Sequence, residues 1–204
     1  VVDVIREEGE AEVLSQAGLR EEEDLFASIW RSARNRWLWL ALNLITAFFA
    51  SRVIGLFDDT IERVVALATL MPIVAGVAGN SGNQTMTLVV RSIALGQLNR
   101  ANVKRLLRKE LVIAALNGVV WGGVAGLFAW LLYRDSPYGQ LLGLIMMLAI
   151  ILNLLIGALI GVLVPLGLER AGRDPAIGSS VLLTFSTDSL GFLIFLGLAT
   201  IFFS

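Results

Sequence analysis

Five long apolar runs take up most of this chain and constrain its fold more than any other feature. They cover residues 37–56, 64–90, 111–132, 141–168 and 177–203. A helix of ~20 residues, rising ~1.5 Å per residue, is long enough to cross the ~30 Å hydrocarbon core of a bilayer. The chain is 56% hydrophobic and only 16% charged, which is too apolar for one soluble domain of this size. We therefore predict an all-α membrane protein with five transmembrane helices.

Charges between the apolar runs predict how the chain is oriented. The segment between the first two runs carries Asp58, Asp59 and Glu62 with a single Arg63. The segment between the second and third runs is strongly basic, with Arg91, Arg100, Lys104, Arg105, Arg108 and Lys109. Because Lys and Arg are enriched on the cytoplasmic side of membrane proteins, we predict a cytoplasmic N-terminus and a C-terminus outside the cell. An odd number of spans leaves no room for two equal inverted halves, so a symmetric pathway would need a second subunit.

Residues 1–36 are polar and are expected to form a cytoplasmic connecting segment ahead of a pore domain at 37–204. The stretch from Arg6 to Asp24 contains ten charges, eight of them acidic, with apolar residues that suggest one weak helical face. The sequence begins with Val1 rather than Met and shows no signal peptide. We expect this segment to follow a region that is missing from the sequence.

The chain contains no cysteine and no histidine. Disulfides and thiolate metal sites are therefore excluded, and so are the imidazole ligands that zinc and copper usually take. A bound metal would have to meet oxygen ligands, as Mg²⁺, Ca²⁺ and Mn²⁺ do. A Gly-x-x-x-x-Gly-Lys-Ser phosphate-binding motif is also absent from the sequence, which argues against a nucleotide-driven pump. We expect neither an enzyme nor a protein with a nucleic-acid partner.

Asp188 is the only charged residue after Asp174, and it lies near the middle of the last apolar run. A carboxylate at that depth costs roughly 2.5–3.5 kcal/mol on membrane-insertion scales. Charged residues inside membrane spans usually mark pathways for ions or protons. The alternative is a structural aspartate that pairs with a neighbouring helix.

Small and polar residues form one helical face in the second run and one in the last. The stretch from Pro72 to Thr85 combines glycines with three amide side chains, which is unusual for a surface that faces lipid. The candidate ion-site residues recur at helical spacing on these two faces. Those in the second run are Gly76, Gly79, Asn83 and Thr87, and those in the last run are Ser180, Thr184 and Asp188. For the glycines alone, a packing interface of the Gly-x-x-x-Gly kind is the simpler interpretation.

The two faces can be compared by their depth in the membrane. Counted from the predicted cytoplasmic ends of their spans, Gly79 and Asp188 are both eleven residues in, or ~16 Å at helical rise. The same count places Asn83 near Thr184. Polar positions that coincide in depth indicate a shared water-filled path, because separate packing interfaces would not need to coincide.

Two blocks of the sequence resemble the MgtE family of magnesium channels. The first block is PIVAGVAGNSGNQ at 72–84, followed by VVRSIALG at 89–96. The second is Asp174-Pro175 followed by LLTFSTDSLGFLIFLGLA at 182–199. With residues 30–46, which also fit, the resemblance covers about the whole chain.

The resemblance implies a membrane-embedded homodimer whose pore runs between the subunits and is lined by the second and fifth spans. It implies that Asp188 holds a hydrated Mg²⁺, the transported ion, and that the other candidate residues line the pore. Mg²⁺ loses its waters reluctantly and is usually bound by one or two carboxylates, which a twofold axis through two copies of Asp188 would supply. Members of the family also carry an acidic N-terminal domain and paired CBS domains that sense cytosolic Mg²⁺. On this comparison those regulatory domains are missing, and residues 10–36 correspond to the connecting helix.

Passive conduction of Mg²⁺ is the leading hypothesis, and three alternatives stay open. A proton-coupled carrier would follow a pH gradient, whereas a channel would conduct at symmetrical pH. An intramembrane aspartyl hydrolase would use two copies of Asp188 as a dyad. A structural scaffold would tolerate Asp188→Ala. The sequence leaves open the selectivity over Ca²⁺, Mn²⁺ and Co²⁺.

Overall fold

The computed structural model describes residues 28–98, 100–176 and 178–203, and the secondary structure of these residues is helical without strands. The helices are α2 (Ile29–Gly55), α3 (Asp58–Arg63), α4 (Ala66–Ala94), α5 (Arg100–Leu132), α6 (Gly139–Arg170) and α7 (Ser179–Phe203). Four of them, α2, α5, α6 and α7, are long and apolar enough to cross a membrane. The predicted all-α class is confirmed.

Helix α4 is the fifth long helix but is more polar than the other four. It has 29 residues, yet its Gly, Ser, Asn and Gln residues keep it outside the group that is apolar enough to span a bilayer. Five spans therefore stay a prediction. Pro72 lies inside α4 without ending the helix, which packed membrane helices tolerate.

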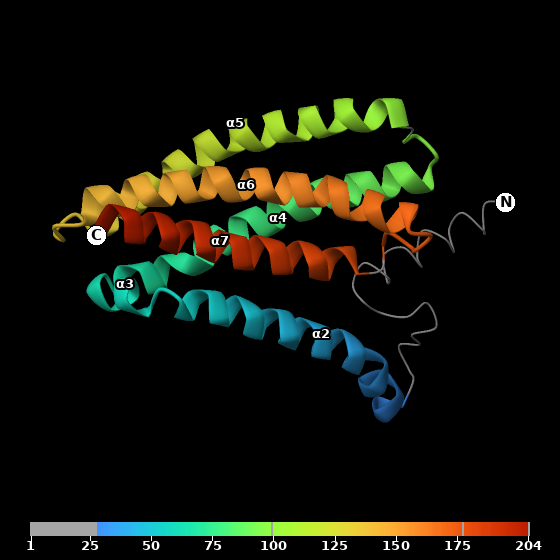
Figure 1. The fold of residues 1–204 in the computed structure, drawn as a ribbon, viewed down its shortest axis with the longest axis horizontal. Helices are drawn as coiled ribbons and strands as arrows, with labels where there is room; N and C mark the ends of the chain where they lie inside the picture. Colours follow the sequence, from blue (N-terminus) through green and yellow to red (C-terminus); the bar gives the residue numbers. More distant parts are fainter. Residues whose placement is uncertain (1–27, 99, 177, 204) are drawn as a thin grey trace.

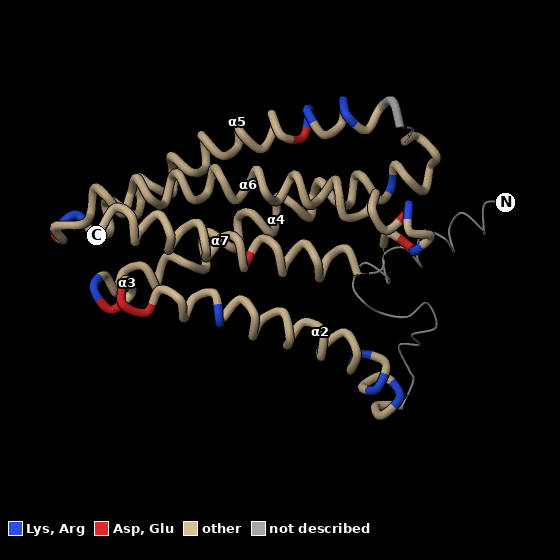
Figure 2. Tube along the Cα trace, viewed as in Figure 1, with Lys and Arg blue, Asp and Glu red and all other residues tan. Residues whose placement is uncertain are grey.

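Helices α5, α6, α7 and α2 run roughly side by side, while α4 crosses them obliquely and packs against α6 and α7 (Figure 1). The short helix α3, the α5–α6 connection and the C-terminus lie at one end of the bundle (Figure 1). The α4–α5 and α6–α7 connections and the start of α2 lie at the other end. Most charged residues gather at these two ends (Figure 2). This distribution is typical of helices whose middle parts face lipid or one another.

Two helices begin earlier than the apolar runs suggest. Residues 91–110, predicted as a basic loop, are mostly helical, because α4 continues to Ala94 and α5 begins at Arg100. Arg and Lys are good helix formers, so the basic residues form the first turns of α5. The break falls at Gly96, whose φ of 63° is left-handed and suits the end of a helix. Helix α2 begins at Ile29 and continues past residue 36. Most of the predicted connecting segment, 1–27, lies outside the described residues.

Helix α6 forms the centre of the bundle. Its buried residues run along almost the whole helix, from Gly139 to Leu166, and it packs against α4, α5 and α7. Helix α2 is the opposite case, since Ala50 is its only buried residue. One of its attachments is an edge-to-face contact between Phe49 and Phe185 of α7, with ring centroids 5.1 Å apart. The core therefore excludes most of α2.

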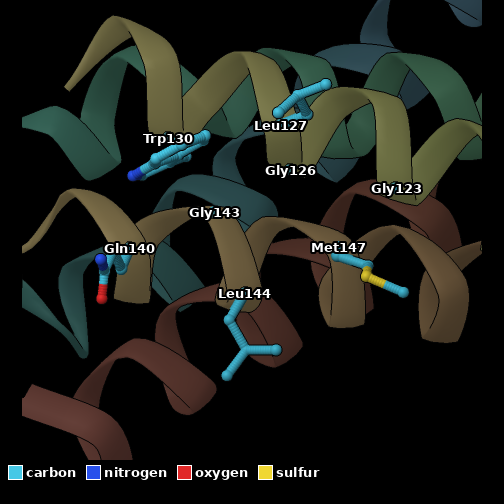
Figure 3. Close-up of a pocket in the computed structure, with 8 residues that line it drawn as sticks. All are labelled: Gly123, Gly126, Leu127, Trp130, Gln140, Gly143, Leu144 and Met147. Atoms are coloured by element: carbon cyan, nitrogen blue, oxygen red, sulfur yellow. The ribbon is translucent and has the colours of Figure 1, made fainter. Parts of the chain in front are cut away.

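Glycines let α5 and α6 approach backbone to backbone. A Cβ placed on Gly126 would lie 2.5 Å from the carbonyl oxygen of Gly143, and one on Gly122 would lie 2.9 Å from that of Met147. Small residues four apart are a common way for membrane helices to pack closely. A hollow of about 280 Å³ lies beside this contact (Figure 3). Gln140 is the only amide in its lining and no charged residue lies there, so it does not suit a cation.

Candidate ion-conduction site

The candidate residues on α4 lie on its open face. Gly76, Asn83 and Thr87 are exposed, and Gly79 is partly exposed. A Cβ on Gly76 would meet nothing within 4 Å. Asn80 is exposed on the same side of the helix. The described chain thus leaves a polar strip uncovered on a helix that otherwise packs against α6 and α7.

The candidate residues on α7 are also accessible. Thr184 is exposed, while Ser180 and Asp188 are partly exposed. Ser186 and Thr187, which flank this face, donate their hydroxyls to carbonyl oxygens of their own helix. The proton of each hydroxyl is thus used within the helix, while the oxygen can still accept a hydrogen bond. None of the seven candidate residues is buried in the structure.

Helices α4 and α7 meet at the level of Asp188. A Cβ placed on Gly79 would lie 3.6 Å from Oγ1 of Thr187, the residue just before Asp188. This is ordinary van der Waals distance, so the two helices touch here without strain. The turn of α4 that holds Gly79 therefore lies beside the turn of α7 that holds Asp188, in agreement with the depth count. The role of these residues as ion ligands stays a prediction.

The Asp188 carboxylate has neither a hydrogen-bond nor an ion-pair partner within residues 28–98, 100–176 and 178–203. A structural aspartate that pairs with a neighbouring helix would have such a partner, so the described part of the chain gives no support to that alternative. Nor do the described residues contain a group of three or more acidic side chains that could hold a metal ion. A lone carboxylate suits a cation that keeps most of its water.

One glycine of the polar stretch, Gly82, does form a close helix-packing contact, although it is not among the candidate residues. A Cβ there would lie 3.1 Å from the carbonyl oxygen of Gly157 in α6. Conversely, a Cβ on Gly157 would lie 2.9 Å from the carbonyl oxygen of Ala78, and one on Gly161 would lie 2.8 Å from that of Gly82. The Gly157-x-x-x-Gly161 spacing in the fourth run was the sequence signal for this contact. It fixes one side of α4 against α6 and leaves the side with Gly76 open.

Two polar residues near the site were missed by the sequence analysis. Asn153 is the only polar residue in the run 141–168 and is fully buried in α6. Its Nδ2 donates to the carbonyl oxygens of Val74 in α4 and Thr187 in α7, each at 3.1 Å. Its position inside an apolar run was the available signal.

Glu110 is the second missed residue. The third span was predicted to begin at residue 111, which left Glu110 in a loop. The structure places it in α5, 6% exposed, where its carboxylate accepts a hydrogen bond of 3.0 Å from Oγ1 of Thr85. Thr85 lies on the buried side of α4. Glu110 therefore ties α5 to the back of the polar helix.

Removing the Glu110 carboxylate is expected to destabilise the fold. Glu110→Ala leaves the buried Thr85 hydroxyl without its acceptor, which costs roughly 1–3 kcal/mol. Glu110→Gln keeps an acceptor oxygen and should lose less. Thermal unfolding in detergent would measure both variants, with the exposed Glu169→Ala as the control. Equal stability of the Ala and Gln variants would contradict a structural role for this bond.

Comparisons with known proteins show which family this chain is similar to. The sequence profile of the MgtE family, described as a divalent cation transporter, matches residues 71–198, from the polar stretch of α4 to most of α7. The magnesium transporter MgtE of Bacillus subtilis (strain 168) is 29% identical over 213 residues, which cover 99% of this chain and 44% of the relative. The corresponding protein of Enterococcus faecalis is 26% identical over 202 residues, with the same coverage.

A third relative is the magnesium transporter MgtE of Thermus thermophilus. It is 30% identical over 161 residues, which cover 79% of this chain and 35% of the relative. The chain thus spans less than half the length of the curated relatives it matches. The similarity includes the helices that carry the candidate site.

Proposed function

The chain belongs to the MgtE family of divalent cation transporters, and on this premise we propose that it conducts Mg²⁺ passively across a cell membrane. The three relatives named above are magnesium transporters, which favours Mg²⁺ over other divalent cations as the substrate. The observation that carries the proposal is the carboxylate of Asp188, which has no partner among the described residues and lies beside Gly79 on the open face of α4. An ion pathway needs such a group, and a packing interface does not.

In this proposal Asp188 attracts the ion and the other candidate residues hold its water shell. Mg²⁺ usually keeps several waters. These waters can donate hydrogen bonds to amide and hydroxyl oxygens of the protein. Asn83 and Thr184 are exposed and available for this task. At Gly76, where a Cβ would meet nothing within 4 Å, the ion and its water can also approach the backbone of α4 closely. The ion would therefore pass without being fully dehydrated.

A second copy of the chain would complete the pathway. One Asp188 supplies one carboxylate, and a twofold axis along the open strip would bring two carboxylates to a central ion. A partner would also shield the polar strip of α4 from lipid, which cannot satisfy amide groups. On this arrangement α4 becomes the fifth span of a homodimeric pore. The basic start of α5 would face the cytoplasm, with the C-terminus outside.

The membrane potential supplies the driving force in this mechanism. Moving one charge through 100 mV is worth about 2.3 kcal/mol, so a divalent ion gains about twice that. A proton gradient is then unnecessary. Regulation by cytosolic domains, and a coupling role for residues 1–36, are part of the proposal because the relatives are longer than this chain.

Uptake into liposomes tests the proposal. The reconstituted chain is given external Mg²⁺ at symmetrical pH, and a potassium gradient with valinomycin sets the potential. A magnesium-sensitive dye inside should report uptake that rises as the interior becomes more negative. Protein-free liposomes provide the baseline. Uptake that occurs only under a pH gradient would favour the proton-coupled carrier, and no uptake under either gradient would refute transport by this chain.

A further inference from the structure

We infer that Asn153 is a positioning residue for the ion site, because it fixes α4 and α7 to each other at the level of Asp188. The inference rests on the proposed function and adds a specificity-determining role for a residue that cannot touch the ion. Asn153 lies in the middle of α6, behind the two helices that carry the candidate site, and has no exposed surface.

The two hydrogen bonds of Asn153 go to different helices. Both N–H groups of one amide are used, one for the carbonyl oxygen of Val74 and one for that of Thr187, and both distances are 3.1 Å. A single planar amide therefore sets the distance between the backbones of α4 and α7. Hydrogen bonds of this kind gain importance in an apolar interior, where water cannot replace a lost partner.

We call Asn153 and its two hydrogen bonds, to the carbonyl oxygens of Val74 and Thr187, the clamp. The Thr187 carbonyl links the clamp to the ion site. It belongs to the peptide group that joins Thr187 to Asp188, so a rotation of α7 that moves this oxygen also moves the carboxylate. On the other side, Val74 lies five residues before Gly79, about 7.5 Å along α4. Asn153 is fully buried where it meets both helices, while Asp188 keeps part of its surface exposed. The clamp is therefore buried, whereas the ion site beside it stays accessible.

The space for the clamp is provided by Gly191. A Cβ placed there would overlap Nδ2 of Asn153 and would lie 3.0 Å from its Cγ. The Oδ1 atom of Asn153 has no hydrogen-bond partner among the described residues. Burying an amide oxygen without a partner costs free energy that an apolar side chain of similar size would not cost. The two hydrogen bonds that Asn153 donates explain why an asparagine is nevertheless found here.

Loss of the clamp should change the selectivity for Mg²⁺ over Ca²⁺ more than it changes the stability of the fold. A shift of ~1 Å at a positioned group can change a rate by ~10²-fold. We therefore expect Asn153→Leu, which keeps the size and loses both donors, to lower the ratio of Mg²⁺ to Ca²⁺ uptake by roughly tenfold. Asn153→Asp, which keeps the shape but offers a carboxylate to two carbonyl oxygens, should lower it at least as much.

The experiment uses two independent measurements on each variant. The first is the ratio of Mg²⁺ to Ca²⁺ uptake in liposomes. The second is the rate of disulfide formation between Gly79→Cys and Thr187→Cys, whose positions face each other across the α4–α7 contact. Because the chain contains no cysteine, this pair reports without background. The control is Asn43→Leu, since Asn43 donates only to Trp39 of its own helix α2.

The clamp predicts a lowered uptake ratio and slower disulfide formation for both Asn153 variants, with neither change in the control. A parent-like disulfide rate would overturn the clamp, and a parent-like ratio would overturn its role in selectivity. If Asn153→Leu does not give a folded protein, Asn153→Ser, smaller and with one donor, decides by the same two measurements. Absence of Mg²⁺ uptake by the unchanged chain would refute the proposed function instead, whatever the disulfide rate.

Discussion

Asp188→Asn is expected to reduce Mg²⁺ uptake by about 100-fold or more while leaving the fold intact. Two unit charges 4 Å apart attract by about 4 kcal/mol at an effective dielectric constant of 20, and a divalent ion doubles this. Losing even a third of that attraction corresponds to about 100-fold. The amide that replaces the carboxylate also removes the cost of burying a charge, so thermal stability should stay the same or rise. Dye-based uptake and thermal unfolding of the same sample would check both parts.

The matched control is Asp135→Asn in the turn between α5 and α6. Asp135 is 96% exposed and lies 3.8 Å from the exposed Arg134, so its loss should change neither uptake nor stability. Asp188→Glu keeps the charge on a longer side chain and should fall between the parent and Asp188→Asn. Parent-level uptake by Asp188→Asn would remove Asp188 from the ion pathway and restore the scaffold interpretation.

Gly126→Ala is expected to destabilise the protein by about 1–3 kcal/mol, although alanine is the better helix former. The added Cβ would lie 2.5 Å from the carbonyl oxygen of Gly143. Because this neighbour is backbone, α5 and α6 would have to move apart, and overpacking of this kind costs about that amount. The measurement is thermal unfolding in detergent.

Gly123→Ala is the control one turn away in the same helix. A Cβ on Gly123 would meet nothing within 4 Å. Replacing this helical glycine with alanine should therefore stabilise by up to about 1 kcal/mol, the ordinary difference in helix propensity. The two substitutions are chemically identical, so opposite signs would isolate the close contact as the cause. The same sign for both would show that the backbone approach of α5 and α6 is not tight.

The apolar runs predicted the helices of the C-terminal half well. The runs at 141–168 and 177–203 match α6 and α7 within two residues at each end. Helix α6 ends just before Ala171 and Gly172, so hydropathy and helix boundary coincide there. The starts of α2 and α5 were missed by eight and eleven residues. Their first turns are rich in Arg and Lys, which form helices readily but carry no hydropathy signal.

Helical spacing and residue counting predicted that Gly79 and Asp188 lie at the same depth, and the structure places them in neighbouring turns of α4 and α7. Periodicity gives the face of a residue, and residue counting gives its height. Neither shows which neighbour lies behind a helix. The packing of Gly82, the clamp of Asn153 and the buried Glu110 all depend on how α6 and α5 pack against α4. Residue patterns can mark such positions, as the Gly157-x-x-x-Gly161 spacing does, but they do not specify which helix each position meets.

The polarity of α4 has a consequence for how the protein enters the membrane during synthesis. A helix with so many amide and small residues gains little by leaving water on its own. The helices that cover its buried side, α6 and α7, lie later in the chain. While the ribosome is still making them, α4 lacks the two helices that cover its buried side. If α4 spans the membrane as proposed, its integration would therefore be a late, cooperative event that depends on helices not yet translated when α4 emerges.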